Sequence, residues 1–177
     1  KIMEFALSEE QELLVDSVSK MLSLSCNVDE LRSQASGEKT FRNKINKEFS
    51  EMGLNGLLVP ERLGGSGLGI LEASLIGEQI GKFAAPAIWI GNSVMTPICL
   101  NNDENKDLAE EWLPRIADGS CISGVAINEY ISKREDNGLT IDNGEISGIS
   151  IFAIDSETNP DIIITVIQDE LYLVETA

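Results

Sequence analysis

The stretch "WLPRIADGSCISGVAIN", residues 112–128, contains the change of period that decides the fold. Up to Gly119, apolar residues recur every three or four positions, as they do along one face of an amphipathic helix. From Cys121 onward the period falls to two, which is typical of strands. Helices followed by strands predict an α+β chain with two domains, which we place at residues 1–119 and 120–177.

The part before this boundary predicts an all-α helical bundle. Ser8 and Gln11 have the spacing of a capping box at the first helix, and Gly53 follows the third helix as a C-terminal cap. Trp89 and Trp112 fall on apolar faces, which predicts that both pack in the core. The predicted helices cover residues 8–24, 28–34, 41–52, 70–83, 87–100 and 103–117.

The part after the boundary predicts a small antiparallel β domain. Asn143–Gly144 and Ser147–Gly148 are both interpreted as hairpin turns. A domain of this size that ends on a strand indicates a longer native chain or a missing partner. The predicted strands cover residues 121–128, 145–154, 161–167 and 170–175.

The composition excludes several classes of function. The net charge of −17, from 30 acidic and 13 basic residues, disfavours binding to nucleic acid and to anionic membranes. The absence of histidine removes the commonest general base and metal ligand, and three widely spaced cysteines match no metal site. No apolar run reaches the roughly 20 residues needed to span a membrane. An odd cysteine count without a signal peptide predicts a cytoplasmic protein.

The glycine-rich stretch "LLVPERLGGSGLG", residues 57–69, raises the question of a phosphate site. A dinucleotide fingerprint would need its third glycine in register and an acidic residue about 20 positions later, and neither is present. A P-loop would need Gly-Lys-Ser/Thr, whereas Ile70 follows Gly69. The alternative is a flexible turn between two buried helices, and we predict that turn.

Four segments, in order, resemble the acyl-CoA dehydrogenase family. "MEFALSEEQELLVDSVSKML" is similar to its opening helix, and "FSEMGLNGLLVPERLGGSGLGILEASLIGEQIGKFAAP" to its Pro-Glu-x-Tyr-Gly-Gly turn with the buried helix that follows. "WLPRIADGSCISGVAINE" resembles its entry into the β domain, and "GEISGISIFAIDSETNPDIIITV" its hairpin ending in [WF]-[IV]-[TS]-[ND]. Each motif is loose, but together they cover nearly the whole chain.

The resemblance implies a flavoprotein that dehydrogenates an acyl-CoA thioester at its α and β carbons. FAD would lie between the β domain and a C-terminal helical domain that is absent from this sequence. The catalytic base, a glutamate, would also lie there, beyond Ala177, so no catalytic residue is assigned within the chain. The acyl pocket would be lined by helices 70–83 and 87–100 together with the C-terminal helices. In this family the glycine-rich segment is a structural turn.

Five residues match positions that contact the flavin in the family. Val125, Ile127 and Asn128 would offer main-chain contacts, and Asn128 replaces the usual threonine. Phe152 matches the aromatic that flanks the isoalloxazine ring, and Ile154 stands in place of the usual hydroxyl residue. No metal ligands are implied.

Two functions remain open at this point. The first is a flavin-dependent acyl-CoA dehydrogenase subunit that passes electrons to an electron-transfer flavoprotein or to oxygen. The second is a non-catalytic, flavin-poor partner in a heteromeric dehydrogenase, which the loss of the Pro-x-Ala-Gly-Ser-Asp segment favours, because Lys133 and Arg134 stand at its Gly-Ser positions. Both imply a homo- or hetero-oligomer. A helical binding scaffold with a small β cap is a third, unrelated alternative.

Overall fold

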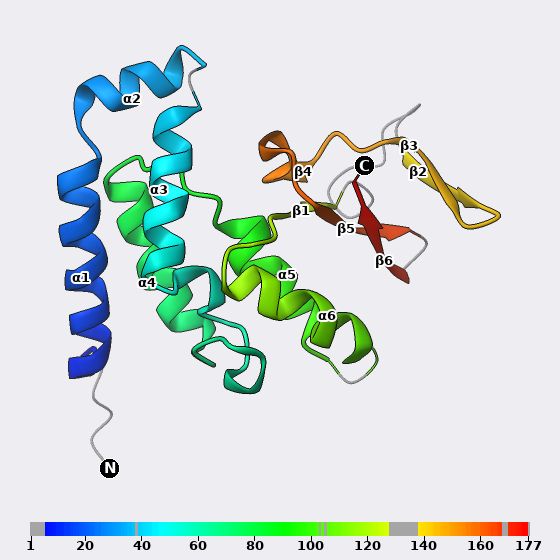
Figure 1. Ribbon diagram of the computed structural model, residues 1–177, viewed down its shortest axis with the longest axis horizontal. Coiled ribbons are helices and arrows are strands. Elements are labelled where there is room, and N and C mark those ends of the chain that lie inside the picture. Colours follow the sequence, from blue (N-terminus) through cyan, green and yellow to red (C-terminus); the bar gives the residue numbers. More distant parts are fainter. Residues whose placement is uncertain are drawn as a thin grey trace.

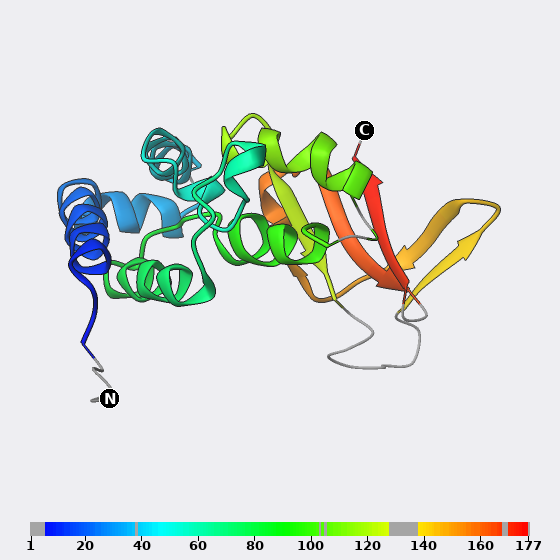
Figure 2. The same cartoon turned by 90° about the horizontal axis from the view of Figure 1, so that it is seen from below.

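The computed structural model describes residues 6–37, 39–102, 104, 106–127, 138–167 and 170–176. The helices α1 to α4 form one end of the molecule and the strands the other, with α5 and α6 between them (Figures 1 and 2). The predicted fold class, a helical region followed by a small, mainly antiparallel sheet, is confirmed. The principal helices are α1 (Glu9–Ser25), α2 (Val28–Ala35), α3 (Thr40–Glu51), α4 (Ile70–Lys82), α5 (Thr96–Leu100) and α6 (Lys106–Ala117).

The ends of two helices follow the sequence signals closely. At α1 the capping box is confirmed: the Gln11 N–H donates to Ser8 Oγ at 3.2 Å, and the Ser8 N–H donates to Gln11 Oε1 at 3.0 Å. After α3, Gly53 has the left-handed conformation (φ 71°) that ends a helix without a steric penalty. These local contacts explain why the predicted and observed helix ends differ by one residue at most.

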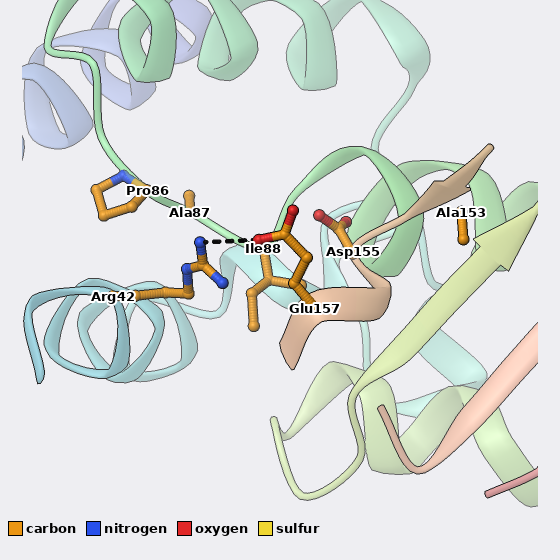
Figure 3. A pocket seen from close by; sticks show the side chains of 7 residues that line it. All are labelled: Arg42, Pro86, Ala87, Ile88, Ala153, Asp155 and Glu157. Carbon is orange, nitrogen blue, oxygen red and sulfur yellow. Dashed lines mark ion pairs between the residues drawn. The ribbon is translucent and has the colours of Figure 1, made fainter. Parts of the chain in front are cut away.

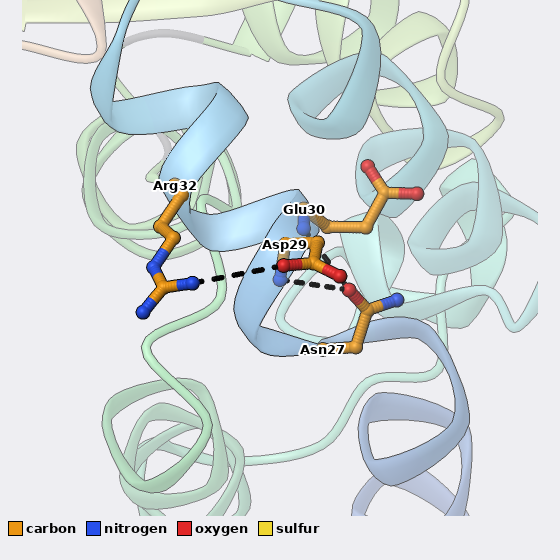
Figure 4. A network of polar contacts seen from close by, with 4 residues as sticks. All are labelled: Asn27, Asp29, Glu30 and Arg32. Carbon is orange, nitrogen blue, oxygen red and sulfur yellow. Dashed lines mark hydrogen bonds and ion pairs between the residues drawn. The ribbon is translucent and has the colours of Figure 1, made fainter.

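The short helix α2 is held by its N-terminal cap. Asn27 Oδ1 accepts hydrogen bonds from the main-chain N–H groups of Asp29 (3.1 Å) and Glu30 (3.0 Å) (Figure 4). An ion pair of 3.8 Å joins Arg32 to Asp29, but both side chains are exposed, so its contribution to stability is small. A cap of this kind contributes about 1 kcal/mol.

Two clusters of buried side chains form the core. The first lies among α1, α3 and α4, where the Phe49 and Trp89 rings pack edge to face with their centroids 5.9 Å apart. The second, which we call the junction core, joins the helices to the strands. In it Leu113 and Ile116 of α6 pack in the same cluster as Val125 and Ile164 of the sheet. Trp112 belongs to this junction core, so both tryptophans are buried as predicted.

The strands form two separate sheets. The larger has the order β4-β1-β5-β6, and β1 pairs with β5 in parallel, whereas its other pairings are antiparallel. The smaller is the hairpin of β2 and β3, which extends away from the helices (Figure 1). The strands are β1 (Ser123–Ala126), β2 (Gly138–Asp142), β3 (Glu145–Ile149), β4 (Ala153–Ile154), β5 (Ile162–Ile167) and β6 (Glu170–Glu175).

The predicted strand 145–154 is two strands, β3 and β4, which belong to different sheets. Asn143–Gly144 is the hairpin turn, as predicted: both residues have positive φ and link the paired Asp142 and Glu145. The prediction of a second turn at Ser147–Gly148 was wrong, because both residues pair with β2 inside β3. The side-chain pattern of Ser147–Gly148 is compatible with a turn or with a strand, and the pairing with β2 makes it a strand.

The predicted helix 87–100 begins only at Ile90. Residues 85–89 are not helical, and the Ile88 N–H donates to the side-chain oxygen of Asn46 at 2.9 Å. A π-helix, η3 (Ile90–Met95), follows and leads directly into α5. The start of this element therefore depends on contacts from distant parts of the chain.

The glycine-rich stretch lies between the 3₁₀ turn η1 (Leu54–Gly56) and helix α4, and it contains a second 3₁₀ turn, η2 (Glu61–Leu63). Its second half folds back against residues 56–60. Its main-chain N–H groups donate within the chain: Gly65 to Pro60 O, Ser66 to Gly56 O, Gly67 to Val59 O and Leu68 to Leu57 O, at 2.9–3.2 Å. A phosphate would need those donors. The predicted turn is therefore confirmed and the phosphate site excluded, but the turn is closely hydrogen-bonded rather than open.

Candidate functional site

An apolar cavity of about 460 Å³ lies between α4, η3 and β4. Helix α4 contributes Ile70, Ala73, Ser74, Gly77, Ile80 and Gly81. The opposite wall consists of Ala87, Trp89, Ile90 and Val94, and one end is formed by Ile154 and Asp155 of the strand side. We call this space the acyl cavity, after the pocket that the family resemblance implies between residues 70–83 and 87–100; that it holds an acyl group stays a prediction.

The element η3 is fastened to β1 by a buried polar network. Asn92 Oδ1 accepts a hydrogen bond from the Ser123 main-chain N–H at 2.8 Å, and the Ser123 hydroxyl lies 3.1 Å from it. The same hydroxyl lies 2.9 Å from Thr96 Oγ1. All three side chains are at most 3% exposed, so these bonds are shielded from water. The network fixes the wall of the acyl cavity relative to the sheet.

We expect replacement of Asn92 with alanine to lower the free energy of unfolding by about 1–3 kcal/mol. The substitution leaves the buried N–H of Ser123 without its acceptor, whereas the Ser123 hydroxyl keeps Thr96 Oγ1 as a partner. An unpaired buried N–H carries most of its desolvation penalty. Chemical denaturation of the wild type and the variant measures the difference. The control Asn102→Ala removes an exposed amide and should change stability by less than about 0.5 kcal/mol; equal effects would contradict a special role for the network.

Asp155 fastens the same element from the other side. Its Oδ2 accepts hydrogen bonds from the N–H groups of Gly91 (2.7 Å) and Asn92 (3.2 Å), at the start of η3. A carboxylate at that position satisfies N–H groups that have no partner within the helix. Asp155 has a positive φ of 58°, a conformation that aspartate tolerates better than most residues. Burial raises the pKa of this carboxyl, while the two N–H groups and Arg42 act in the opposite direction.

Asp155 makes stability depend on pH with a predictable sign. Because the pKa is raised in the folded state, the folded protein binds this proton more readily than the unfolded one. The stability that the group contributes is therefore present below the ordinary aspartate pKa of about 4 and is lost as pH rises through the raised pKa. Arg42 and Glu157 are the charged side chains that face it.

We therefore expect Asp155→Asn to gain stability relative to the wild type as pH is raised from about 4 to 7. The amide still accepts both N–H groups but stays uncharged. As a control, Asp155→Ala loses the acceptor and should be less stable by about 1–3 kcal/mol. Unfolding free energies of the three proteins at several pH values test this, and a difference between Asn and wild type that stays constant with pH would contradict it.

A second, smaller cavity of about 200 Å³ lies on the other side of Asp155 (Figure 3). Arg42 of α3 reaches across its mouth and makes an ion pair of 3.6 Å with Glu157 of the 3₁₀ turn η5 (Ser156–Thr158). Glu157 is largely exposed, so the pair is a weak tie between helices and strands. Asp155 and Ala87 line both cavities and form the partition between them.

Four of the five predicted flavin-contact residues lie close together: Val125 in β1 and Ile154 in β4, with Ile127 just after β1 and Phe152 just before β4. Val125 pairs with Ile154, and the Ile127 N–H donates to Phe152 O at 3.0 Å, which continues the same ladder. Val125 is 1% exposed and packs in the junction core, whereas Ile127, Phe152 and Ile154 are half-buried. Asn128 lies outside the described residues. The flavin roles of all five stay predictions.

The sequence motifs did not identify Asp155 and Asn92 as residues that hold the site together. A signal for Asp155 was present, because it occupies the [ND] position of the hairpin motif. Asn92 gave no signal, since Ser123, which donates to its side-chain oxygen, lies 31 residues away in the chain. Cys121 at the junction is no nucleophile at neutral pH, because burial raises the pKa of its thiol to about 11.

Two features are absent from the described part of the chain. Within it, no group of three or more histidine, cysteine, aspartate or glutamate side chains is placed to hold a metal ion. Among the helices of that part, none combines the length and the apolar character that crossing a membrane requires.

A helical bundle joined to a small sheet, with an apolar cavity where the two meet, defines the class of fold, and comparison with known proteins identifies the family. The family model "Acyl-CoA dehydrogenase, N-terminal domain" matches residues 8–120. Mitochondrial isovaleryl-CoA dehydrogenase of Pongo abelii is 30% identical over 126 residues, which are 70% of this chain and 30% of that protein. The chain belongs to the acyl-CoA dehydrogenase family and spans less than a third of this relative's length.

Solved structures agree with the fold. The acyl-CoA dehydrogenase from Bacillus anthracis, complexed with FAD, superposes with a TM-score of 0.73 at 22% identity, covering 98% of this chain and 32% of that one. One chain of the ChsE4–ChsE5 complex from Mycobacterium tuberculosis superposes with a TM-score of 0.67 at 17% identity, covering 92% and 43%. Both likenesses concern the fold.

Proposed function

We propose that the chain is a subunit of a flavin-dependent acyl-CoA dehydrogenase that oxidises the Cα–Cβ bond of an acyl-CoA thioester. One observation supports this most: Ile154, at a position that contacts flavin in the family, also lies at the end of the acyl cavity. Dehydrogenation requires the acyl chain and the flavin to meet at one place. The strand assigned to the flavin and the helices assigned to the acyl chain share that boundary.

The described residues fit the apolar face of a flavin ring. Phe152 and Ile154 are half-buried and two positions apart along an extended segment, so their side chains share a face of the sheet. The polar fit is poorer, because the Ile127 N–H is engaged by Phe152 O and Ile154 carries no hydroxyl. Each hydrogen bond missing from the cofactor would weaken its binding by about 0.5–1.5 kcal/mol.

In this proposal FAD supplies the hydride acceptor, and the chain's own residues place the reactants. Phe152 and Ile154 would pack against the ring, while α4 and η3 would enclose the acyl chain and keep water from it. Asp155 holds η3 against β4 and so keeps the end of the cavity in place. The glutamate that removes the α-proton would lie outside this sequence.

A second candidate is a flavin-poor partner within a heteromeric dehydrogenase. The engaged Ile127 N–H and the apolar Ile154 favour it, because both reduce the hydrogen bonds available to a flavin. In that role the chain would shape the acyl cavity, and another acyl-CoA dehydrogenase subunit would hold the cofactor. An electron-transfer flavoprotein or oxygen would accept the electrons in either case.

The visible absorption spectrum of the purified protein, with and without added FAD, separates the two candidates. The first candidate is supported if the wild type shows a bound-flavin band and if Phe152→Ala lowers its affinity for FAD at least tenfold. The control Ile151→Ala changes the adjacent, exposed side chain and should leave the affinity within twofold. No band at excess FAD, followed by a band when an acyl-CoA dehydrogenase subunit is added, supports the second.

A further inference from the structure

Two glycines of α4, Gly77 and Gly81, lie on the wall of the acyl cavity. Their spacing of four residues places them one above the other on the same helix face. Trp89, Ile90 and Val94 line the cavity from the other side. Glycine at both positions therefore widens the cavity along about one turn of the helix.

Glycine is an unfavourable choice for the interior of a helix. Each glycine lowers helix stability relative to alanine, because it loses more conformational freedom on folding. The backbone does not require it here, since both residues have ordinary helical conformations inside α4. A reason for two glycines must come from their surroundings.

Packing within the described residues does not require glycine either. A Cβ atom at Gly81 would meet nothing within 4 Å, and one at Gly77 would meet Trp89 Nε1 at 3.6 Å, an ordinary van der Waals contact. Gly65 in the turn shows the contrast, because a Cβ there would lie 2.1 Å from Val59 O. The two helix glycines thus keep open a space that the chain itself does not fill.

We propose that the acyl cavity takes an acyl group wider than a single methylene chain, either branched or ring-bearing, with its bulk between these glycines and Trp89. The inference rests on the proposed function. A straight chain needs no local widening, whereas a branch or ring needs lateral room at one level. The surrounding walls are mostly apolar, and the carboxylate of Asp155 is engaged by the N–H groups of Gly91 and Asn92, which suits a hydrocarbon group.

The double variant Gly77→Ala/Gly81→Ala tests this in the complete protein, together with any subunit that copurifies. Both alanines favour the helix, so the thermal midpoint should stay the same or rise, and lost binding cannot then be attributed to unfolding. The matched control is Glu78→Ala, which also introduces alanine into α4 but at an exposed position outside the cavity.

Binding of two probes, 3-cyclohexylpropionyl-CoA and butyryl-CoA, is measured by isothermal titration calorimetry, which needs neither turnover nor a flavin signal. The double variant should bind the ring-bearing probe at least tenfold more weakly than the wild type and butyryl-CoA within threefold, and the control should bind both as the wild type does. If the ratio of the two probe affinities is the same in the double variant as in the wild type, the inference about the width of the acyl group is wrong, while the proposed function stands. The glycines would then make room for another helix. If neither probe binds the wild type, the proposed function fails as well.

Discussion

Replacement of Gly65 with alanine should destabilise the protein by at least about 3 kcal/mol. A Cβ atom at this position would lie 2.1 Å from Val59 O and 2.5 Å from Gly56 O, distances that no side-chain rearrangement can relieve because both atoms belong to the main chain. The turn would have to open and release the hydrogen bonds that Ser66 and Gly67 donate to those same oxygens. Effects of this size arise from overpacking combined with lost buried hydrogen bonds.

The neighbouring glycine is the matched control for this prediction. A Cβ atom at Gly64 would meet nothing within 4 Å, but the residue has a φ of +86°, which strains any other amino acid. Gly64→Ala should therefore cost only about 1–2 kcal/mol. Chemical denaturation of both variants measures the difference, and equal losses would show that backbone strain rather than steric overlap governs the turn.

Replacement of Trp89 with alanine should lower the free energy of unfolding by about 3–5 kcal/mol. The indole is 5% exposed, packs edge to face on Phe49 and separates the helical core from the acyl cavity. Its removal would leave a void that joins the cavity, so the loss includes both the buried surface and the contacts of the remaining atoms.

A double-mutant cycle isolates the aromatic pair. Trp89→Phe keeps a ring at the position and should cost less than the alanine variant. Combining Trp89→Ala with Phe49→Leu should reveal a coupling of about 0.5–1.5 kcal/mol. A coupling near zero would mean that Trp89 acts through burial alone, and a loss below about 1 kcal/mol for Trp89→Ala would contradict the packing that the structure shows.

The sequence predicted those elements whose signals are local. The cap at Ser8, the helix end at Gly53 and the turn at Asn143–Gly144 each depend on residues within four positions, and each is confirmed. The same holds for the change of period after Gly119, because periodicity reflects which side chains each element can bury.

The elements that the sequence mispredicted depend on distant partners. The helix expected from residue 87 starts at Ile90, where the carboxylate of Asp155, 64 residues further along the chain, accepts the N–H of Gly91. The strand expected over residues 145–154 divides because its second half pairs with β1 and its first half with β2. Neither the choice between these partners nor the parallel pairing of β1 with β5 is encoded in local residue spacing.

The residues of the candidate site also divide into those that the sequence could indicate and those that depend on distant partners. The resemblance assigned Val125 and Ile154 to one flavin site, and the structure pairs these two residues across β1 and β4; their contacts with a flavin stay predictions. The anchor at Asn92 could not be predicted, since its hydrogen bond joins segments far apart in sequence. The motif marks the position of Asp155 but does not reveal that its carboxylate binds the N–H groups of Gly91 and Asn92.

The junction core determines how cooperatively the helical and strand parts unfold. Residues of α6 and of strands β1 and β5 share one buried cluster, so cutting the chain after Gly119 would expose apolar surface on both fragments. The change of period at that point marks two kinds of secondary structure, but we expect a single foldon across it. Hydrogen exchange at amides of Leu113 and Ile164 should therefore report one common opening, and a protease should find no early cleavage site at the boundary.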